Sequence, residues 1–270
     1  MKQVRRRWFV VIFALVGGLG VLFVLLPLAT TVLATRPVDL WKTLVDPEVA
    51  KSITTTFLAG AIATSLGLVL GVPLAYLLAR YRFPAKGLVD GIVMLPVVIP
   101  HTAAGIALLM VFGSKGLLGA PLQRFGIFFV DRLAGVVAAM LFVGMPFLIS
   151  ASREAFAAVD VEMEKVAMID GAGPWQAFLY VTLPQAWRGI AAGALMMWAR
   201  GISEFGAVAI LAYHPRVVPV LIFERFQGYG LSAARPVAVI LILAVLAVFT
   251  GIRLLAALKQ NGEKKDPSSG

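Results

Sequence analysis

A long uncharged run near the start of the chain constrains its fold more than any other feature. From Trp8 to Thr35, 28 consecutive residues include no Asp, Glu, Lys or Arg. A helix needs about 20 apolar residues to cross the hydrocarbon core of a bilayer. The apolar part of a signal peptide is only about 7–15 residues long. The run therefore predicts a retained membrane-spanning helix rather than a cleaved signal.

The composition extends this prediction to the whole chain. Of the 270 residues, 60% are hydrophobic and 14% are charged, whereas soluble domains have about 45–50% and about 25%. A soluble domain of this size could not bury so much apolar surface in one core. The apolar runs are continuous rather than alternating, which favours helices over a barrel. We expect an all-α, polytopic membrane bundle. The net charge of +10 is then assigned to basic loops near lipid headgroups, not to nucleic acid.

Similar runs predict about six membrane spans. An even number of spans places both termini on one side. That side carries 14 Lys and Arg residues in its loops and ends, against 9 on the other. Since basic residues concentrate in cytoplasmic loops, both termini are predicted to be cytoplasmic. The predicted spans are 8–35, 52–79, 91–114, 133–152, 189–212 and 236–252.

The longest predicted cytoplasmic loop, 153–187, has more residues than a simple connection needs. Gly171 can end a short helix in the left-handed conformation, and Pro174 suits the first turn of the next helix. Pro184 is expected to stop or bend that second helix. The pattern predicts two short helices around a sharp corner. The polar tail, 259–270, is expected to be disordered, so the transmembrane domain is predicted to span 1–258.

The loop resembles the signature loop of permease subunits in binding-protein-dependent ABC importers. The family pattern is Glu-Ala-Ala, three residues, Gly, nine residues, an aliphatic residue, any residue, then Leu-Pro. Gly171 and the Leu183-Pro184 pair keep this frame, whereas Lys165 replaces the acidic residue of the triplet and Glu164 precedes it. The resemblance implies that the loop docks on a cytoplasmic ATPase and transmits its closure to the membrane helices. The residues assigned to this role are Glu162, Glu164, Lys165, Val166, Ala167, Gly171, Leu183 and Pro184.

Three further stretches, 95–109, 198–215 and 219–243, resemble molybdate/tungstate transporter permeases. Ser-Glu-Phe-Gly in the second stretch is among the most telling pieces. The resemblance covers about 49–252 and implies a type I ABC importer permease fold in a prokaryotic cytoplasmic membrane. It also implies a homodimer, two cytoplasmic ATPase subunits and an external oxyanion-binding protein. Sulfate/thiosulfate permeases share a related stretch, so a sulfate importer is an alternative cargo assignment. An ATP-independent anion channel or carrier is an alternative of another class.

No nucleotide-binding or catalytic motif accompanies these features. The chain has no Gly-x-x-x-x-Gly-Lys-Ser/Thr loop to cradle phosphates. ATP and Mg are therefore expected on a partner ATPase, and no cofactor is expected on this chain. It has no cysteine and only two histidines without clustered carboxylates, which predicts no metal site. An integral-membrane enzyme is disfavoured because no catalytic cluster gathers at one depth.

Arg200 and Glu204 are four residues apart and share one helix face. Each costs about 2.5–3.5 kcal/mol at membrane depth, so both are expected to face a bundle interior or a wet cavity. One hypothesis is that they border the translocation pathway, where Arg200 offers its guanidinium to a tetrahedral dianion. The alternative is an ion pair that only braces the bundle. The prolines of the third predicted span indicate a kinked helix beside the pathway. The pathway candidates are Pro100, His101, Thr102, Arg200, Ser203 and Glu204.

Overall fold

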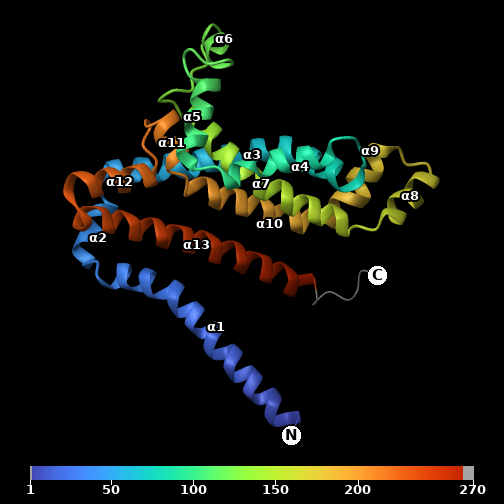
Figure 1. Cartoon of the computed structure of the whole chain (residues 1–270), viewed down its shortest axis with the longest axis horizontal. Helices are drawn as coiled ribbons and strands as arrows, with labels where there is room; N and C mark the ends of the chain where they lie inside the picture. Colours follow the sequence, from blue (N-terminus) through green and yellow to red (C-terminus); the bar gives the residue numbers. More distant parts are fainter. Residues whose placement is uncertain (1, 264–270) are drawn as a thin grey trace. The chain divides into compact units, whose positions relative to one another are not determined.

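The computed structural model describes residues 2–263, and within them the secondary structure is helical with no strand (Figure 1). The all-α prediction is confirmed for this part of the chain. The chain divides into two compact units. The terminal unit comprises the chain up to Ala50 and from Ile222 onward, and the central unit comprises Lys51–Leu221.

The terminal unit is built from helices at both ends of the chain. The long helix α1 (Lys2–Leu33) is followed by the short α2 (Pro37–Leu44), and α13 (Leu231–Glu263) closes the chain. From residue 6 onward, nearly every side chain of α1 is exposed. A helix that is apolar all round suits a lipid environment. α13 stays helical through Glu263, so the prediction of disorder is wrong for residues 259–263. Residues 264–270 of the predicted tail lie outside the described residues.

The central unit holds most of the helices, and α7 runs beside α10 along much of its length (Figure 1). Glycines permit this approach: a Cβ on Gly193 would lie 2.9 Å from the Cβ of Ala151. Gly189 meets Ala155 in the same way. The pair at residues 189 and 193 therefore serves close packing within the chain. The elements of this unit are α3 (Pro47–Arg80), α4 (Lys86–Val98), α5 (His101–Phe112), α6 (Gly119–Gln123), α7 (Leu133–Ala158), α8 (Val161–Ile169), α9 (Pro174–Ala177), η1 (Phe178–Thr182), α10 (Leu183–Ile202), α11 (Gly206–Leu211) and the start of α12 (Val218–Tyr229).

Two buried apolar clusters stabilise the central unit. One cluster includes Met140 on α7 and Val208 on α11. The other includes Leu78 at the end of α3 and Phe156 at the end of α7. In a membrane bundle, such side chains stabilise the fold through close packing between helices rather than through transfer out of water. The first cluster supports the short helix α11, and the second lies at the α3 and α7 ends that precede the signature loop.

The predicted third span, 91–114, is not one straight helix. It is divided into α4 and α5, whose axes are bent by 115°. Pro100 has no backbone N–H to continue the helix, and the residue before a proline is driven out of the helical region. Ile99 is accordingly extended, with ψ of 146°. The sequence indicated a kink, and the structure shows a complete change of direction.

The predicted fifth span, 189–212, is also interrupted. α10 begins earlier than predicted, at Leu183, and ends at Ile202, before α11 begins at Gly206. By length and composition, residues 2–263 contain four helices able to cross a membrane, or five if the bent pair α4–α5 is one span. The polytopic class is confirmed. The remaining predicted span, 189–212, corresponds to α10 and α11, and Arg188 and Arg200 make α10 more polar than the four long helices.

Candidate functional site

The first candidate region is the segment 160–184, hereafter the coupling element. α8 begins after Asp160, whose carboxylate accepts the N–H of Glu162 at 3.0 Å and caps the helix. It ends at Ile169, and Gly171, just past the Asp170 C-cap, has φ of +97°. The N–H of Gly171 bonds to the carbonyl of Met168 at 3.1 Å, and the N–H of Ala172 bonds to that of Ala167 at 2.9 Å. These paired bonds form a Schellman motif, so the predicted left-handed end of α8 is confirmed.

In the second half of the coupling element, the prediction for Pro174 is confirmed, and the prediction that Pro184 stops the helix is wrong. Pro174 opens α9, as expected. Pro184 does not stop the helix, because α9, η1 and α10 follow one another without a gap. The five residues before Leu183 are π-helical, and the N–H of Leu183 bonds to the carbonyl of Phe178, five residues earlier. A wider turn of this kind accommodates a residue that cannot make the usual i−4 bond.

Glu164 is the structural centre of the coupling element. Its Oε1 accepts hydrogen bonds from Arg80 Nη2 at 2.7 Å and Nε at 3.1 Å, and from Thr182 Oγ1 at 2.7 Å. The side chains of Arg80 and Glu164 are only 8% and 10% exposed. One carboxylate therefore joins the end of α3, the middle of α8 and the end of η1. Arg80 and Thr182 were not identified from the sequence, since no local pattern links residues that are 84 and 18 positions from Glu164.

The outward face of the coupling element is different in character. Lys165 is exposed and pairs with Glu162 at 2.6 Å, and this contact raises the pKa of the Lys165 ammonium. The coupling element also exposes large apolar side chains: Val166 on α8 is 56% exposed, and Trp175 on α9 is 77% exposed. Ala167 and Leu183 are half-buried, and Pro184 is exposed. Exposed apolar patches of this kind mark interaction surfaces.

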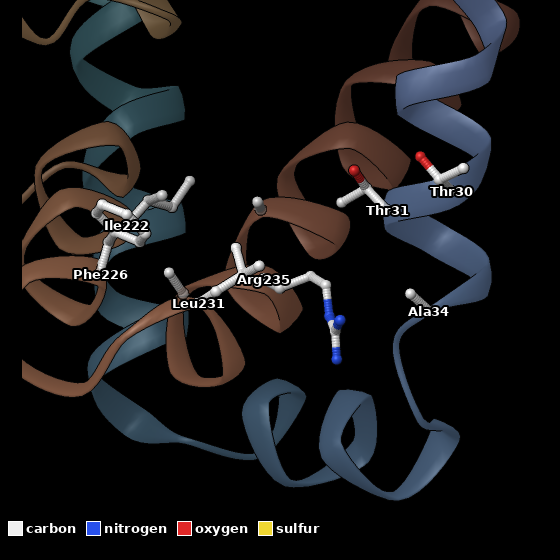
Figure 2. A pocket seen from close by; sticks show the side chains of 9 residues that line it. Thr30, Thr31, Ala34, Ile222, Phe226, Leu231 and Arg235 are labelled. Carbon is white, nitrogen blue, oxygen red and sulfur yellow. The ribbon is translucent and has the colours of Figure 1, made fainter.

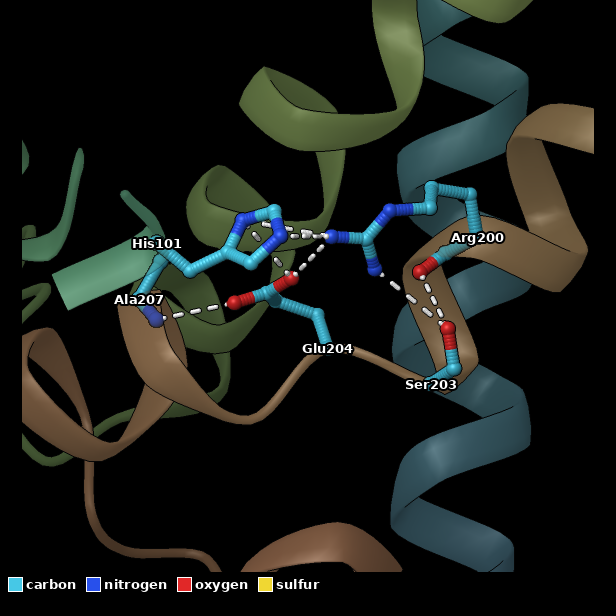
Figure 3. Close-up of polar contacts among 5 residues, drawn as sticks. All are labelled: His101, Arg200, Ser203, Glu204 and Ala207. Atoms are coloured by element: carbon cyan, nitrogen blue, oxygen red, sulfur yellow. Dashed lines mark hydrogen bonds and ion pairs between the residues drawn. The ribbon is translucent and has the colours of Figure 1, made fainter. Parts of the chain in front are cut away.

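The second candidate region is an open pocket of about 390 Å³, hereafter the polar pocket. It lies where both interruptions occur, between the start of α5 and the break that separates α10 from α11 (Figure 3). Pro100, the residue before α5, is the N-cap of that helix and is not among the lining residues. The residues that line the pocket are His101, Thr102, Arg200, Ser203, Glu204, Phe205 and Gly206.

Side chains of the polar pocket themselves end one helix and begin the next. Ser203 Oγ donates to the carbonyl of Arg200 at 3.0 Å, and such local bonds compete with a continuing helix. Glu204 Oε1 accepts the N–H of Ala207 at 2.9 Å and satisfies a free donor at the start of α11. A Cβ on Gly206 would lie 2.8 Å from the Cβ of His101. Glycine is therefore required where α11 approaches α5.

An ion pair and an imidazole form the centre of the polar pocket. Arg200 Nη2 donates to Glu204 Oε2 at 2.8 Å and lies 2.8 Å from His101 Nε2 (Figure 3). Arg200 Nη1 donates to Ser203 Oγ at 3.3 Å. Glu204 is 1% exposed, whereas the side chains of Arg200 and His101 are 22% and 44% exposed. The carboxylate is thus enclosed, and its two partners face the opening.

This geometry defines what the polar pocket can do. Arginine has no acceptor, so the imidazole nitrogen that accepts its hydrogen bond is unprotonated. The charges of Arg200 and Glu204 cancel formally, so the resting pocket holds no excess charge. The contacts brace α5 against the α10–α11 break, and part of the Arg200 guanidinium remains exposed in the pocket. The sequence identified the charged residues and His101, and it indicated Gly206 as a position for close helix approach or bending, but it did not identify the N–H of Ala207. Among residues 2–263, no three His, Cys, Asp or Glu side chains gather as metal ligands.

Comparison with known protein families assigns the chain. The family described as the binding-protein-dependent transport system inner membrane component matches residues 67–261, which include both candidate regions. The chain belongs to this family. As an inner membrane component with several apolar helices, it is a multi-pass membrane protein.

Similar individual proteins are also transport proteins, which agrees with this family assignment. The molybdate/tungstate transport system permease protein of Thermococcus kodakarensis is 42% identical over 257 residues, covering 94% of this chain and 99% of its own. The sulfate transport system permease protein of Escherichia coli is 31% identical over 254 residues, covering 90% and 92%. The fold is also that of a bacterial alginate ABC transporter chain, with a TM-score of 0.73, 17% identity and coverage of 92% and 93%.

Proposed function

We propose that this chain is the membrane-spanning permease subunit of an ATP-driven, binding-protein-dependent importer of molybdate and tungstate. The observation that carries the proposal is the similarity to the Thermococcus permease, which extends over almost the whole of both chains. The lower identity to the sulfate permease favours molybdate and tungstate over sulfate as cargo. All three ions are tetrahedral dianions, so the fold itself suits any of them.

The coupling element supports ATP-driven transport. Its inner side is fixed to the central unit through Glu164, Arg80 and Thr182. Its outer side presents exposed apolar side chains such as Val166 and Trp175. A rigid element with an uncovered apolar face suits docking to a partner that pushes on it. We assign this partner to a cytoplasmic ATPase, which supplies the ATP and Mg sites.

The polar pocket is proposed to border the anion pathway. It lies at two helix interruptions, and backbone of this irregular kind is tolerated at membrane depth only where it is buried in protein or lines a water-filled cavity. The exposed part of the Arg200 guanidinium can meet a dianion as it passes. Thr102 and Ser203 add hydroxyl groups to the lining. Because Glu204 offsets the arginine, the anion is not held tightly.

The assembly that completes the importer is a homodimer with two ATPase subunits and an external oxyanion-binding protein. The basic-residue bias supports cytoplasmic termini and a cytoplasmic position for the coupling element. Residues 1–258 then form the transmembrane domain of a prokaryotic cytoplasmic membrane protein. In this arrangement, closure of the ATPases moves residues 162–184 of the coupling element and opens the pathway outward.

Reconstitution tests the proposal. The chain is placed in liposomes with its ATPase and binding protein, and uptake of radiolabelled tungstate, molybdate and sulfate is measured with and without ATP. We expect ATP-dependent uptake of tungstate and molybdate that excess sulfate does not reduce. Strong sulfate uptake would overturn the cargo assignment, and uptake without ATP would overturn the importer.

A further inference from the structure

A second pocket lies entirely within the terminal unit and takes no part in the proposed pathway. It has a volume of about 340 Å³ and is formed between the end of α1, the second half of α12 and the start of α13 (Figure 2). Its walls are mostly apolar, with Ile222, Phe226 and Leu231 among the lining residues. Its polar groups are the hydroxyl of Thr30, the hydroxyl of Thr31 and the guanidinium of Arg235.

Among residues 2–263, Arg235 is a half-buried arginine that makes no ion pair with a carboxylate. Its Nε is buried and makes no hydrogen bond within the described residues. By contrast, Arg80, Arg200 and Arg225 each contact an acidic side chain at 2.7–2.8 Å. The hydroxyl of Thr31 donates to the carbonyl of Pro27 in the same helix at 2.7 Å. A hydroxyl is neutral, so it does not neutralise the charge of Arg235. A partly enclosed cation without a counter-ion is unfavourable, and an anion bound in the pocket would compensate it.

The position of the pocket along its helices indicates where that anion comes from. Thr30 and Thr31 lie in the last turn of the apolar stretch Arg6–Leu33, and Arg235 lies near the start of the apolar stretch Leu231–Gly251. The ends of membrane spans lie at the level of lipid headgroups. Phe226 and Leu231 are 53% and 62% exposed, so the apolar wall is open. Such a wall can receive an acyl chain beside the cation.

We propose that the terminal-unit pocket binds one anionic phospholipid. Its phosphate pairs with the Arg235 guanidinium, and an acyl chain covers Ile222, Phe226 and Leu231. Arginine suits this role because its planar donors match phosphate oxygens. The apolar lining favours a lipid over free inorganic phosphate, which could not cover these side chains. The proposal requires membrane insertion but is independent of the proposed cargo.

Native mass spectrometry of the full-length chain tests this proposal. The protein is purified in a neutral detergent, stripped of lipid and titrated with phosphatidylglycerol or with phosphatidylcholine of the same acyl chains. We expect one phosphatidylglycerol to bind about tenfold more tightly than phosphatidylcholine, because the choline ammonium of phosphatidylcholine offsets the charge of its phosphate beside Arg235. Arg235→Gln should remove this preference. Arg36→Gln is the matched control, because Arg36 is exposed in the same unit and does not line the pocket, and it should keep the preference.

Further variants and probes separate the alternatives. Arg235→Lys keeps the cation and should retain part of the preference, which guards against a folding defect in Arg235→Gln. Ala238→Phe keeps the charge but fills the pocket, and it should weaken binding of both lipids. Equal binding of both lipids to the wild-type chain, or an unchanged preference in a folded Arg235→Gln, would overturn the proposal. Displacement of the lipid by an equal concentration of inorganic phosphate would also overturn it, in favour of a free-anion site.

Discussion

The coupling element and the polar pocket each contain a buried glutamate paired with an arginine, but the two pairs differ in their surroundings. Glu164 and Arg80 are both enclosed, and the third partner, Thr182, is also buried. Glu204 is enclosed, whereas Arg200 and His101 face an open pocket. The first pair, with Thr182, connects the distant helix α3 to α8 and η1 of the coupling element, and the second pair lies within α10 and the break that follows it.

This difference in exposure indicates that the two glutamate–arginine ion pairs have different roles. A fully enclosed pair resists change, because separating the charges leaves one of them buried and uncompensated. It suits an element that must transmit force without yielding. A pair that is open on one side can exchange a contact with a passing anion and then restore it. We therefore propose a positioning role for Glu164 and a pathway-lining role for Arg200.

Removal of the enclosed carboxylate is expected to have the largest effect. Glu164→Ala leaves the Arg80 guanidinium buried without a partner, which should cost about 3–5 kcal/mol of stability. The variant should unfold at a lower temperature and lose stimulation of the partner ATPase. Glu162→Ala is the matched control for stability, since its pair with Lys165 is exposed and on the same helix; it should change the unfolding temperature little. Equal effects of the two substitutions would contradict the positioning role.

The next prediction separates bracing from pathway lining in the polar pocket. Arg200→Gln should abolish tungstate uptake, because Glu204 keeps its charge and loses its counter-ion. The double variant Arg200→Gln/Glu204→Gln removes both charges and leaves an amide that can still accept the Ala207 N–H. If Arg200 meets the anion, the double variant should be folded by thermal unfolding and still inactive. Recovery of uptake in the double variant would show that the pair only braces the bundle.

A smaller effect is expected at the corner of the coupling element. Gly171 has a left-handed backbone, and no atom lies within 4 Å of the position that a Cβ would occupy. Gly171→Ala should therefore cost about 1–2 kcal/mol through backbone conformation alone. Gly173→Ala is the control, because Gly173 has φ of −71° and needs no such conformation. Thermal unfolding of both variants measures the difference, and equal values would contradict the Schellman end of α8.

The smallest effect concerns a third, more open pair in the terminal unit. Arg225 Nη2 lies 2.7 Å from Asp46 Oδ2, and this hydrogen bond lowers the pKa of the Asp46 carboxyl below its usual 3.8. The contact is therefore fully present above pH 3.8 and is lost as pH falls through the lowered folded pKa. In the wild-type chain, the unfolding temperature should fall as the pH is lowered below 3.8 and the Asp46 carboxylate is protonated. Asp46→Asn should make this fall smaller. Asp39→Asn, in the same unit, removes an acid outside this contact and should leave the fall unchanged.

The sequence predicted the local features of both regions and missed the distant contacts. The end of α8 at Gly171 and the shared face of Arg200 and Glu204 follow from backbone preference and helical spacing. The link from Glu164 to Arg80 depends on how α3 packs beside the coupling element, and spacing carries no information about that. The helix break after Ile202 was missed for a related reason: it depends on the close approach of α11 to α5.

The central claim is that the coupling element docks on the ATPase and moves with it, and tethering of this element tests the claim most directly. Because the chain has no cysteine, an introduced cysteine is the only thiol on this subunit. A single cysteine replaces the exposed Val166, and a short disulfide-cleavable crosslinker tethers it to the ATPase in the reconstituted importer. Val69→Cys, exposed on the membrane helix α3, is the control. Uptake of tungstate with ATP is measured before tethering, after it and after reduction. We predict that only the cysteine at residue 166 forms the tether, that the tether stops uptake and that reduction restores it. Failure to form the tether, or undiminished uptake through a tethered complex, would contradict the account.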